Sequence, residues 1–555
     1  MLKFKNNLNI LIPLLYRLYN VILKNGIYPE NWSKSMIVPI LKKGDKNNTD
    51  NYRGISLINV ISKIFTKILN ARLVKWAGTN QKMHREQAGR STIDQIFVLN
   101  ALVEKYISRK KGRFYTVYVD FSKAFDSIPH LNLWFRLINN GIHGNILCVL
   151  RSMYSQLKSC IFTGEGLSEF FGCTVGTMQG CMLSPFLFIF YLNEFIEFCK
   201  NSSCQGIYVD ENAPNILMLL FADDMVECGD TVGKLQSLIN KLSEYCKNWG
   251  LSVNLSKTKV MVFRNGGIIR RNEKWFLDGK QIETCSHYKY LGLMISSKLT
   301  WGMATKTLAN QASKVLYIMK SIQYKCGDIP FSVYKDLYEK MVIPILCYGS
   351  EVWGFEVSHN IESVQRKFLK YYLGVGTHTS NAAVLGETGM YPVSIYYIYR
   401  CIKYWLKLLS MDTHSYPHCS YKMLLNLSEN GRITWATKIK RLLFRNGYGY
   451  VWLNQGVGNE ELFLHDFKKR LIDCSLQEWT AELNSNSRLS EYKLFKINFD
   501  AEYYLSCVKT RKYRIALCKL RCSSHNFAIE KGRHTGIARI DRLCSHCLEF
   551  GQELI

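Results

Sequence analysis

The sequence has no long uninterrupted hydrophobic run. None of its apolar stretches reaches the ~18–20 residues that a membrane-spanning helix needs. The apolar stretch at residues 10–15 is short, and no small-residue cleavage site follows it, so we interpret it as the buried face of a helix and not as a signal peptide. We therefore expect an intracellular protein, in the nucleus or the cytoplasm, with no membrane partner.

Acidic residues are scarce relative to basic ones. The chain has 44 Asp and Glu against 72 Lys and Arg, which gives a net charge of +28 over 555 residues. Such an excess favours a polyanionic partner, most often nucleic acid, and ranks an anionic membrane surface well below it. A hydrophobic content of 47% and an aromatic content of 13% are typical of globular chains. The length predicts two to four domains of about 100–200 residues each.

The 19 cysteines are odd in number and scattered, which does not favour a disulfide framework. Several lie inside apolar segments, Cys148 and Cys181 among them. We interpret these as reduced core thiols of an intracellular protein.

One hydrophobic run ends in two adjacent carboxylates. Residues 216–222 carry no charge, Asp223 and Asp224 follow, and Met225 begins a second apolar stretch. This pattern predicts a buried strand, a tight turn and a second strand. Two adjacent carboxylates repel each other, so a divalent metal ion is the natural counter-charge. An ordinary surface hairpin is the commoner explanation of an Asp-Asp pair taken alone.

Three other stretches carry candidate chemistry. Residues 117–119 predict a strand that ends at Asp120. In the stretch 172–186, a glycine-rich loop enters an apolar helix that runs to about residue 198, and glycine there allows close approach of a flat ligand. Two strands joined by a lysine-tipped turn precede both stretches. Their Lys and Arg side chains suit contact with phosphate groups, and an ordinary solvated turn explains them equally well. Helices are predicted at residues 59–78, 92–108, 129–140 and 231–249.

The rest of the chain is helical and basic from about residue 303. Basic and aromatic residues alternate there, for example Lys370, Tyr371, Tyr372 and Trp405. The alternation fits nucleic-acid binding, and it fits ordinary amphipathic helices equally well.

A Cys-x-x-Cys pair stands near the end of the chain. Cys544 and Cys547 have zinc-ligand spacing, but no second pair follows them before Ile555. Cys518, Cys522 and His525 lie upstream as the residues that would complete a site. The pattern predicts an incomplete zinc-binding motif, so Zn²⁺ is not among the expected cofactors.

Taken together, the motifs in order resemble a reverse transcriptase of the LINE-like, non-LTR retrotransposon class, of the jockey-like type. The resemblance covers about residues 20–410 and again 505–547. Its motifs are Tyr-Val-Asp-Phe-Ser-Lys-Ala-Phe-Asp at 118–126, Gln-Gly-Cys-Met-Leu-Ser-Pro at 179–185, Phe-Ala-Asp-Asp at 221–224, Asn-Leu-Ser-Lys-Thr-Lys at 254–259 and Tyr-Leu-Gly at 290–292.

The resemblance implies an α+β right-hand polymerase of fingers, palm and thumb, followed by a mostly helical C-terminal region. The expected division is an N-terminal helix and fingers at 1–115, a reverse transcriptase domain at 20–297 with its palm at about 114–130 and 170–297, a helical thumb at 298–410, and a C-terminal region at 411–555 that holds the partial Cys/His motif.

The implied activity is an RNA-directed DNA polymerase that extends a DNA primer with dNTPs on an RNA template, the RNA of its own element. The reaction is an in-line nucleotidyl transfer with two Mg²⁺ ions, Mn²⁺ being the alternative ion. By the resemblance, Asp120 and Asp223 bridge the metals, Asp224 is a secondary carboxylate, the carbonyl of Phe121 is a further ligand, and Lys257 is the general acid that protonates pyrophosphate. Lys259 is equally basic and close by.

The same resemblance assigns residues to the nucleotide and the primer. Phe125 lies under the sugar and excludes a 2′-hydroxyl. The implied β- and γ-phosphate ligands are Lys43 and Arg53, with Lys42 as the alternative lysine. Gln179 and Gly180 flank the template–dNTP pair. Tyr290, Leu291 and Gly292 are expected to contact the primer.

The sequence departs from the family pattern at residues 86–95. This stretch is about four residues shorter than usual and lacks a Phe-Arg pair, so nucleotide binding by the fingers is in question. No endonuclease domain precedes residue 1, and the terminal Cys/His motif is cut in half, which predicts a truncated genomic copy. The alternative function is therefore a catalytically inactive remnant that only binds RNA or DNA. A group II intron maturase or a telomerase fits the motif wording less well.

Overall fold

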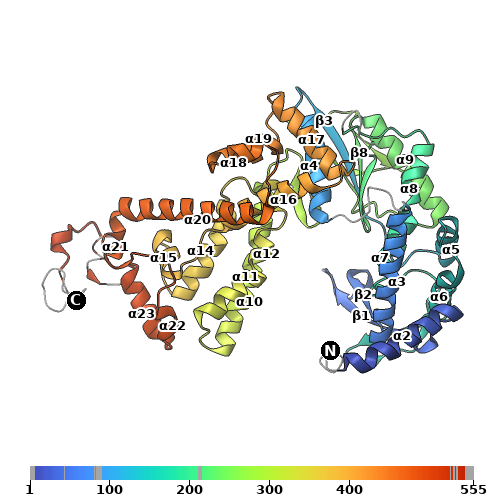
Figure 1. Ribbon diagram of the computed structural model, residues 1–555, viewed down its shortest axis with the longest axis horizontal. Coiled ribbons are helices and arrows are strands. Elements are labelled where there is room, and N and C mark those ends of the chain that lie inside the picture. The colour runs from blue at the N-terminus through green and yellow to red at the C-terminus, as the bar shows by residue number, and fades with distance from the viewer. Residues whose placement is uncertain are drawn as a thin grey trace. The chain divides into compact units, whose positions relative to one another are not determined.

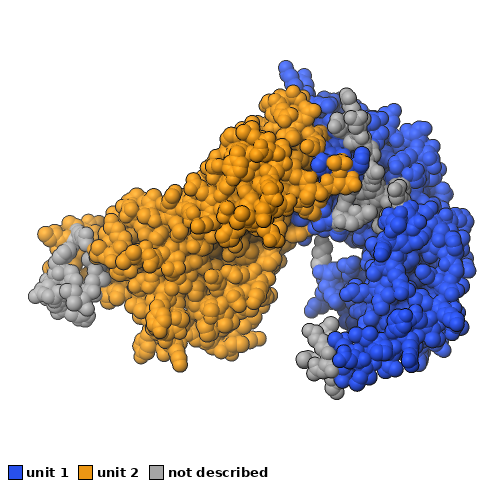
Figure 2. Space-filling view, in the orientation of Figure 1, with its two compact units in different colours: residues 1–291, 414–420 blue, residues 292–413, 421–555 orange. Residues whose placement is uncertain are grey.

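The computed structural model describes residues 7–42, 44–80, 82, 91–209, 215–525, 527, 528, 530, 532 and 535–543. It divides into two compact units, shown in Figure 2. Unit 1 comprises residues 1–291 and 414–420, and unit 2 comprises residues 292–413 and 421–555. Among the described residues, no helix has both the length and the apolar character needed to cross a bilayer.

Unit 1 mixes helices and strands (Figure 1). In chain order its elements are α2 (Leu8–Asn25), η1 (Glu30–Trp32), β1 (Lys34–Leu41), η2 (Thr49–Asn51), β2 (Tyr52–Leu57), α3 (Val60–Thr79), α4 (Thr92–Ile107), β3 (Arg113–Val119), α5 (His130–Asn139), α6 (Gly144–Ser155), β4 (Lys158–Thr163), β5 (Gly166–Leu167), β6 (Phe171–Gly172), α7 (Ser184–Leu192), α8 (Glu194–Asn201), β7 (Met218–Phe221), β8 (Asp224–Gly229), α9 (Val232–Trp249), β9 (Lys259–Arg264), β10 (Phe276–Leu277), β11 (Lys280–Gln281), β12 (Glu283–Cys285) and β13 (His287–Tyr290).

Unit 2 is mostly helical over its described residues. Its elements, with the helix α17 that begins in the 414–420 segment, are β14 (Leu293–Ser296), α10 (Gly302–Cys326), α11 (Phe331–Met341), α12 (Ile343–Leu346), α13 (Ser350–Trp353), α14 (His359–Leu373), α15 (Asn381–Thr388), α16 (Val393–Ser410), α17 (Tyr416–Glu429), α18 (Trp435–Arg445), α19 (Gly449–Leu453), α20 (Glu460–Ser485), η3 (Ser487–Leu489), α21 (Tyr492–Phe495), α22 (Tyr504–Cys507), α23 (Arg511–Arg521) and η4 (Arg539–Asp541).

The central sheet of unit 1 has the order β12-β9-β3-β8-β7. β3 lies between β8 and β9 and pairs antiparallel with both. Alternate residues of β3, among them Tyr115 and Val117, belong to the same buried cluster as Leu235 and Leu238 of α9. The sheet is therefore covered on that face by an apolar helix surface, which fixes the ends of its strands.

Local sequence signals set the helices around this sheet. At the start of α9, the Thr231 hydroxyl accepts a hydrogen bond from the backbone N–H of Lys234, and the helix ends at Gly250 in the left-handed conformation. At the start of α4, Ser91 and Asp94 form a reciprocal capping box. These caps explain why the predicted helices at 231–249 and 92–108 form close to their expected bounds.

A second sheet joins β1 and β2 to the segment before the glycine-rich loop. β1 and β2 pair antiparallel, as the two strands flanking the lysine-tipped turn were expected to do. β4 joins β1 in parallel register, and β4 pairs with β5 and β6. The apolar helix predicted after the loop is two helices, α7 and α8, which meet at Asn193.

The structure corrects one expectation about side chains and bears on another question that the sequence left open. Cys181 is buried as predicted, but Cys148 is exposed, because α6 turns Leu147, Val149 and Leu150 inward and leaves Cys148 on its outer side. In unit 2, Tyr372 and Trp405 of the basic helices are fully buried. Amphipathic packing, and not a row of stacking platforms, explains that part of the alternation.

Candidate active site

Three aspartates gather at neighbouring strand ends of the central sheet. β3 ends at Val119, which pairs with Met225, the second residue of β8. Asp120 therefore follows β3 beside Asp224, the first residue of β8. Asp223 lies in the turn between β7 and β8, after Ala222, whose φ of 54° is left-handed. The predicted strand, turn and strand are all present.

The charges of Asp223 and Asp120 act on Asp224. Partial burial raises the pKa of Asp224 to about 6, and the negative charges of Asp223 and then Asp120 add to the rise. Oxygen donors of like charge held this close are a ligand set suited to a hard divalent cation, which would relieve the repulsion.

Asp120 is held from the loop after α9. Its backbone N–H donates to the Thr258 hydroxyl at 3.2 Å, and its carbonyl accepts from the backbone N–H of Asn254 at 2.8 Å. Phe121, the next residue, forms a bridge with Val253. Both backbone groups of Asp120 are therefore occupied by the 253–258 loop, which orients its side chain.

The same loop presents Lys257 to Asp120. The Lys257 ammonium lies 3.4 Å from a carboxylate oxygen of Asp120. Lys259, which the sequence could not separate from Lys257, points to Glu283 instead, with a nitrogen–oxygen distance of 2.5 Å. The difference follows from where the two residues lie, because Lys259 is the first residue of β9 and pairs in register with Glu283 of β12, whereas Lys257 lies in the loop before the strand.

The Gln179 side chain joins two other candidate residues. The Arg53 Nε donates to Gln179 Oε1 at 3.2 Å, and Gln179 Nε2 donates to both carboxylate oxygens of Asp126 at 3.0 Å. The Gln179 carbonyl also accepts from the backbone N–H of Ser56 at 2.7 Å. The predicted residues Arg53 and Gln179 thus lie together. Asp126, the last residue of the 118–126 motif, is a further partner that no local signal in the sequence indicated.

Gly180 permits this close docking of the loop on β2. Its φ is +133°, and a Cβ atom placed there would lie 2.4 Å from the Ser56 carbonyl oxygen. No other residue type fits without displacing one of the two segments. Lys42 stands at the end of β1, where its positive charge acts on Asp126.

Phe125 and Tyr290 are placed by aromatic packing. The Phe125 ring lies 4.9 Å from the Phe188 ring of α7, and its backbone carbonyl accepts from the Thr177 N–H at 2.6 Å. Tyr290 is 2% exposed and packs on Tyr118 at 5.7 Å. The Tyr290 side chain therefore belongs to the core behind Asp120. If the 290–292 segment contacts a primer, other atoms of the turn would make that contact.

A further positioning residue is Gln95 of α4. Its side-chain amide donates to the carbonyl of Leu220 in β7 at 3.0 Å, and Gln95 is 1% exposed. This bond ties α4 to the strand that leads into Asp223. The sequence offered only one signal for this role, a glutamine next to the capping residue Asp94. Nothing in the sequence indicated that its partner would be Leu220.

Several predicted residues lie outside the described part of the chain. These are Lys43, Cys544, Cys547 and, of the shortened 86–95 stretch, residues 86–90. Leu291 and Gly292 are described as the turn after β13, both with positive φ (45° and 87°), and the division between units 1 and 2 falls between them.

The match to a known protein family covers the residues of this candidate site. Residues 40–295 match the family described as reverse transcriptase (RNA-dependent DNA polymerase). The chain is 23% identical over 359 residues to the probable RNA-directed DNA polymerase from transposon BS of Drosophila melanogaster, covering 63% of this chain and 39% of that protein. It is 28% identical over 280 residues to the Pol polyprotein of the type-1 retrotransposable element R2 of Popillia japonica, covering 49% of this chain and 38% of that protein.

Among solved structures, apo telomerase from Candida tropicalis aligns with 12% identity and a TM-score of 0.37, over 83% of this chain and 74% of that one. The chain spans about two fifths of the length of the curated relatives it matches. The α+β class with a mostly helical C-terminal region is confirmed by the structure. Residues 40–295 therefore match a reverse transcriptase domain, and the similar proteins are those of a transposon and of a type-1 retrotransposable element.

Proposed function

We propose that this chain is an RNA-directed DNA polymerase that extends a DNA primer with dNTPs on the RNA of its own element. The observation that carries the proposal is the convergence of Asp120, Asp223 and Asp224 at adjoining strand ends, with Lys257 against Asp120. The family match and the RNA-directed DNA polymerases among the relatives support the same reaction.

Reverse transcriptases depend on divalent metal ions, and the donor set here fits such ions. Asp120, Asp223 and the Phe121 carbonyl would hold them, with Asp224 as a secondary carboxylate. All of these offer oxygen ligands, which Mg²⁺ prefers, and Mn²⁺ would be accepted by the same set. When bound, the metal would stabilise charge on the attacking and leaving oxygens.

The surrounding residues would position the substrates. Arg53 and Lys42 supply positive charge beside the Gln179–Gly180 loop, where we place the triphosphate and the template–dNTP pair. Phe125, fixed against Phe188, would stand under the sugar and select against a 2′-hydroxyl. Lys257 would donate a proton to the departing pyrophosphate.

The test is primer extension on an RNA template with the purified chain, comparing dNTPs with NTPs. Asp223→Ala should reduce incorporation by about 10³-fold or more, because a lost metal ligand removes several kcal/mol of transition-state stabilisation. The matched control is Asp278→Ala, a half-exposed aspartate paired with Lys247 on the β10–β11 turn, which should leave the rate nearly unchanged.

Metal binding gives a second readout. Calorimetric titration with Mg²⁺ or Mn²⁺ should show binding to the unaltered chain and to Asp278→Ala, and weakened binding to Asp223→Ala. Incorporation that survives Asp223→Ala would contradict the proposal. RNA binding without any incorporation by the unaltered chain would establish the alternative of an inactive remnant.

A further inference from the structure

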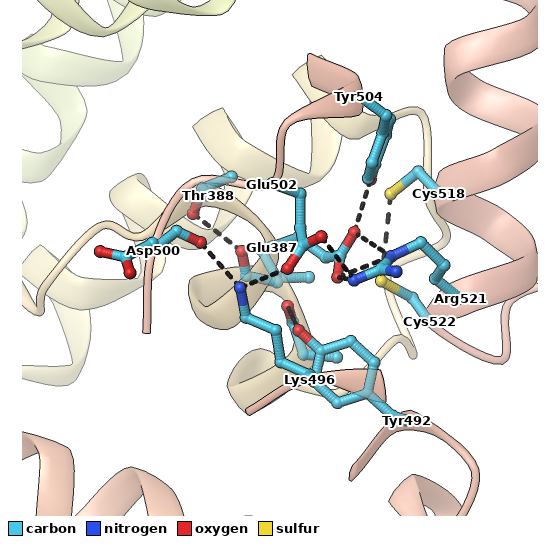
Figure 3. Close-up of polar contacts among 12 residues, drawn as sticks. Glu387, Thr388, Tyr492, Lys496, Asp500, Glu502, Tyr504, Cys518, Arg521 and Cys522 are labelled. Atoms are coloured by element: carbon cyan, nitrogen blue, oxygen red, sulfur yellow. Dashed lines mark hydrogen bonds and ion pairs between the residues drawn. The ribbon is translucent and has the colours of Figure 1, made fainter. Parts of the chain in front are cut away.

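Unit 2 contains a buried cluster of two thiols and a carboxylate that the polymerase reaction does not use. Glu387 lies near the end of α15, and Cys518 and Cys522 lie four residues apart at the end of α23. Their exposed fractions are 0%, 0% and 2%. Figure 3 shows the three side chains converging from the two helices.

The distances in this cluster match those of a metal site. The Sγ atoms of Cys518 and Cys522 are 3.9 Å apart, and one ligand atom from each of the three residues lies within 4.8 Å of the others. Two sulfurs bound to one tetrahedral zinc at ~2.3 Å would be about 3.8 Å apart. The sulfur pair is thus already at the spacing that a shared metal ion imposes, and well beyond the ~2.05 Å of a disulfide.

The Glu387 carboxylate is already oriented by neighbours of the kind that support a metal ligand. Arg521 donates to both its oxygens at 2.9–3.1 Å, and the Tyr504 hydroxyl donates to Oε2 at 2.6 Å. The Arg521 Nε–H is shared between the two oxygens, so a metal ion bound to Oε1 would displace only one branch of this shared hydrogen bond. Outer hydrogen bonds of this kind hold a metal ligand in place.

Charge balance is satisfied with a divalent ion present. Arg521 and Lys496 both pair with Glu502, and Arg521 also pairs with Glu387. The charges of the carboxylates Glu387 and Glu502 and of the cations Lys496 and Arg521 therefore sum to zero. Two thiolates then add a charge of −2, which one divalent ion neutralises in this buried place. Cysteine sulfur selects a soft or borderline ion, Zn²⁺ first.

The geometry points to a structural zinc site made by Glu387, Cys518 and Cys522, with a water in the fourth position, since the Tyr504 hydroxyl is engaged by Glu387. The ion would link α15 to α23 within unit 2. The residues are distinct from Cys544 and Cys547, and the inference is independent of polymerase activity. Binding would release the two thiol protons as the zinc–sulfur bonds form.

The test uses the full chain with Cys544→Ser and Cys547→Ser, so that the terminal thiols cannot contribute. This background should retain one zinc per chain by elemental analysis. Replacing zinc by Co²⁺ should give the thiolate charge-transfer absorption and the visible bands of a tetrahedral sulfur site. Adding Cys518→Ser and Cys522→Ser should abolish both signals, and Glu387→Gln should weaken Co²⁺ binding by at least about 10-fold.

The matched control is the exposed pair Cys326→Ser and Cys507→Ser in the same background, which should keep the zinc and the Co²⁺ spectrum. Alkylation followed by mass spectrometry gives a readout that needs no substitution in the site. Cys518 and Cys522 should be protected with zinc and become reactive after chelation, while Cys326 and Cys507 react in both states. If the serine variant fails to fold, this readout and the Co²⁺ spectrum of the intact background decide.

Three outcomes would overturn the inference. The first is an intact background that binds no zinc and gives no thiolate absorption with Co²⁺. The second is a spectrum that persists without the two thiols in a folded chain. The third is recovery of a Cys518–Cys522 disulfide as the resting state of the freshly purified chain.

Discussion

At the scale of single residues, the structure separates two lysines that the sequence could not. Lys257 approaches Asp120 at 3.4 Å and its side chain is 62% exposed, so it can reach a bound substrate. Lys259 is paired with Glu283 and its side chain is 20% exposed. We therefore propose Lys257 as the proton donor, because it lies beside Asp120 and Lys259 does not.

We predict that Lys257→Ala slows single-turnover incorporation by roughly 10²-fold or more, the usual contribution of a general acid. Lys259→Ala should change the rate by no more than a few-fold, because it breaks only an ion pair outside the site. Rapid-quench measurement at saturating dNTP checks both variants. Equal losses in the two would argue against Lys257 as the donor.

At the scale of elements, strand β8 has a different chemistry on each face. Asp224 and Val226 share the face toward Tyr118, whereas Met225 and Glu227 point to the opposite face. Glu227 is completely buried there, and neither carboxylate oxygen has a hydrogen-bond partner. Burial raises the pKa of Glu227 from 4.5 to about 8, so the side chain is neutral at pH 7.

This pKa predicts how the stability of unit 1 varies with pH. The folded state holds a proton on Glu227 that the unfolded state has lost between pH 4.5 and about 8. The free energy of unfolding therefore falls as pH rises through that window, by about 1.4 kcal/mol for each unit of pKa difference. Glu227→Gln should remove this slope, and thermal or urea unfolding across pH 5–9 measures it.

The control for that prediction is Glu244→Gln on α9. Glu244 is half-exposed and pairs with Lys241, so its substitution should leave the slope in place. An unchanged slope in Glu227→Gln would mean that Glu227 finds a polar partner in solution.

At the scale of the whole molecule, the excess of 28 positive charges is the dominant property. The net charge is a property of the composition and does not depend on the fold. It predicts that nucleic-acid binding is largely electrostatic. Part of the aromatic content that seemed suited to base stacking is instead buried, as Tyr372 and Trp405 are in unit 2. Affinity should therefore depend mainly on backbone phosphates.

We predict a linear fall of log K for single-stranded RNA with log salt concentration, with a slope of about −0.7 for each phosphate neutralised. Asp223→Ala should keep this slope while strongly reducing incorporation, since it removes a proposed metal ligand and no proposed phosphate contact. Fluorescence anisotropy over a salt series checks the slope. Salt-independent binding would mean that stacking or base contacts dominate.

Much of the fold and the core of the site could be predicted from local sequence. The strand, turn and strand around Asp223 follow from an apolar run broken by two carboxylates, and the helices α4 and α9 follow from their caps and periodicity. The end of β3 just before Asp120 follows from its strand-forming residues. The assignment of fingers, palm and thumb to numbered ranges stays a prediction.

Other features could not be predicted because they depend on long-range contacts. Only the docking of the glycine-rich loop on β2 brings Gln179 between Arg53 and Asp126. The apolar neighbours of Cys148 did not reveal that its side chain is exposed, because even a helix rich in apolar residues has one face toward solvent.

The sequence by itself determined the kind of chemistry: paired carboxylates, a glycine-rich loop and an excess of positive charge are local or summed properties. The tertiary structure decided which groups act together. It set Lys257 and not Lys259 on Asp120, and it joined Glu387 to Cys518 and Cys522 from separate helices. The physical reason is that spacing along a chain fixes the side of one element, whereas contact between elements depends on how their buried faces pack.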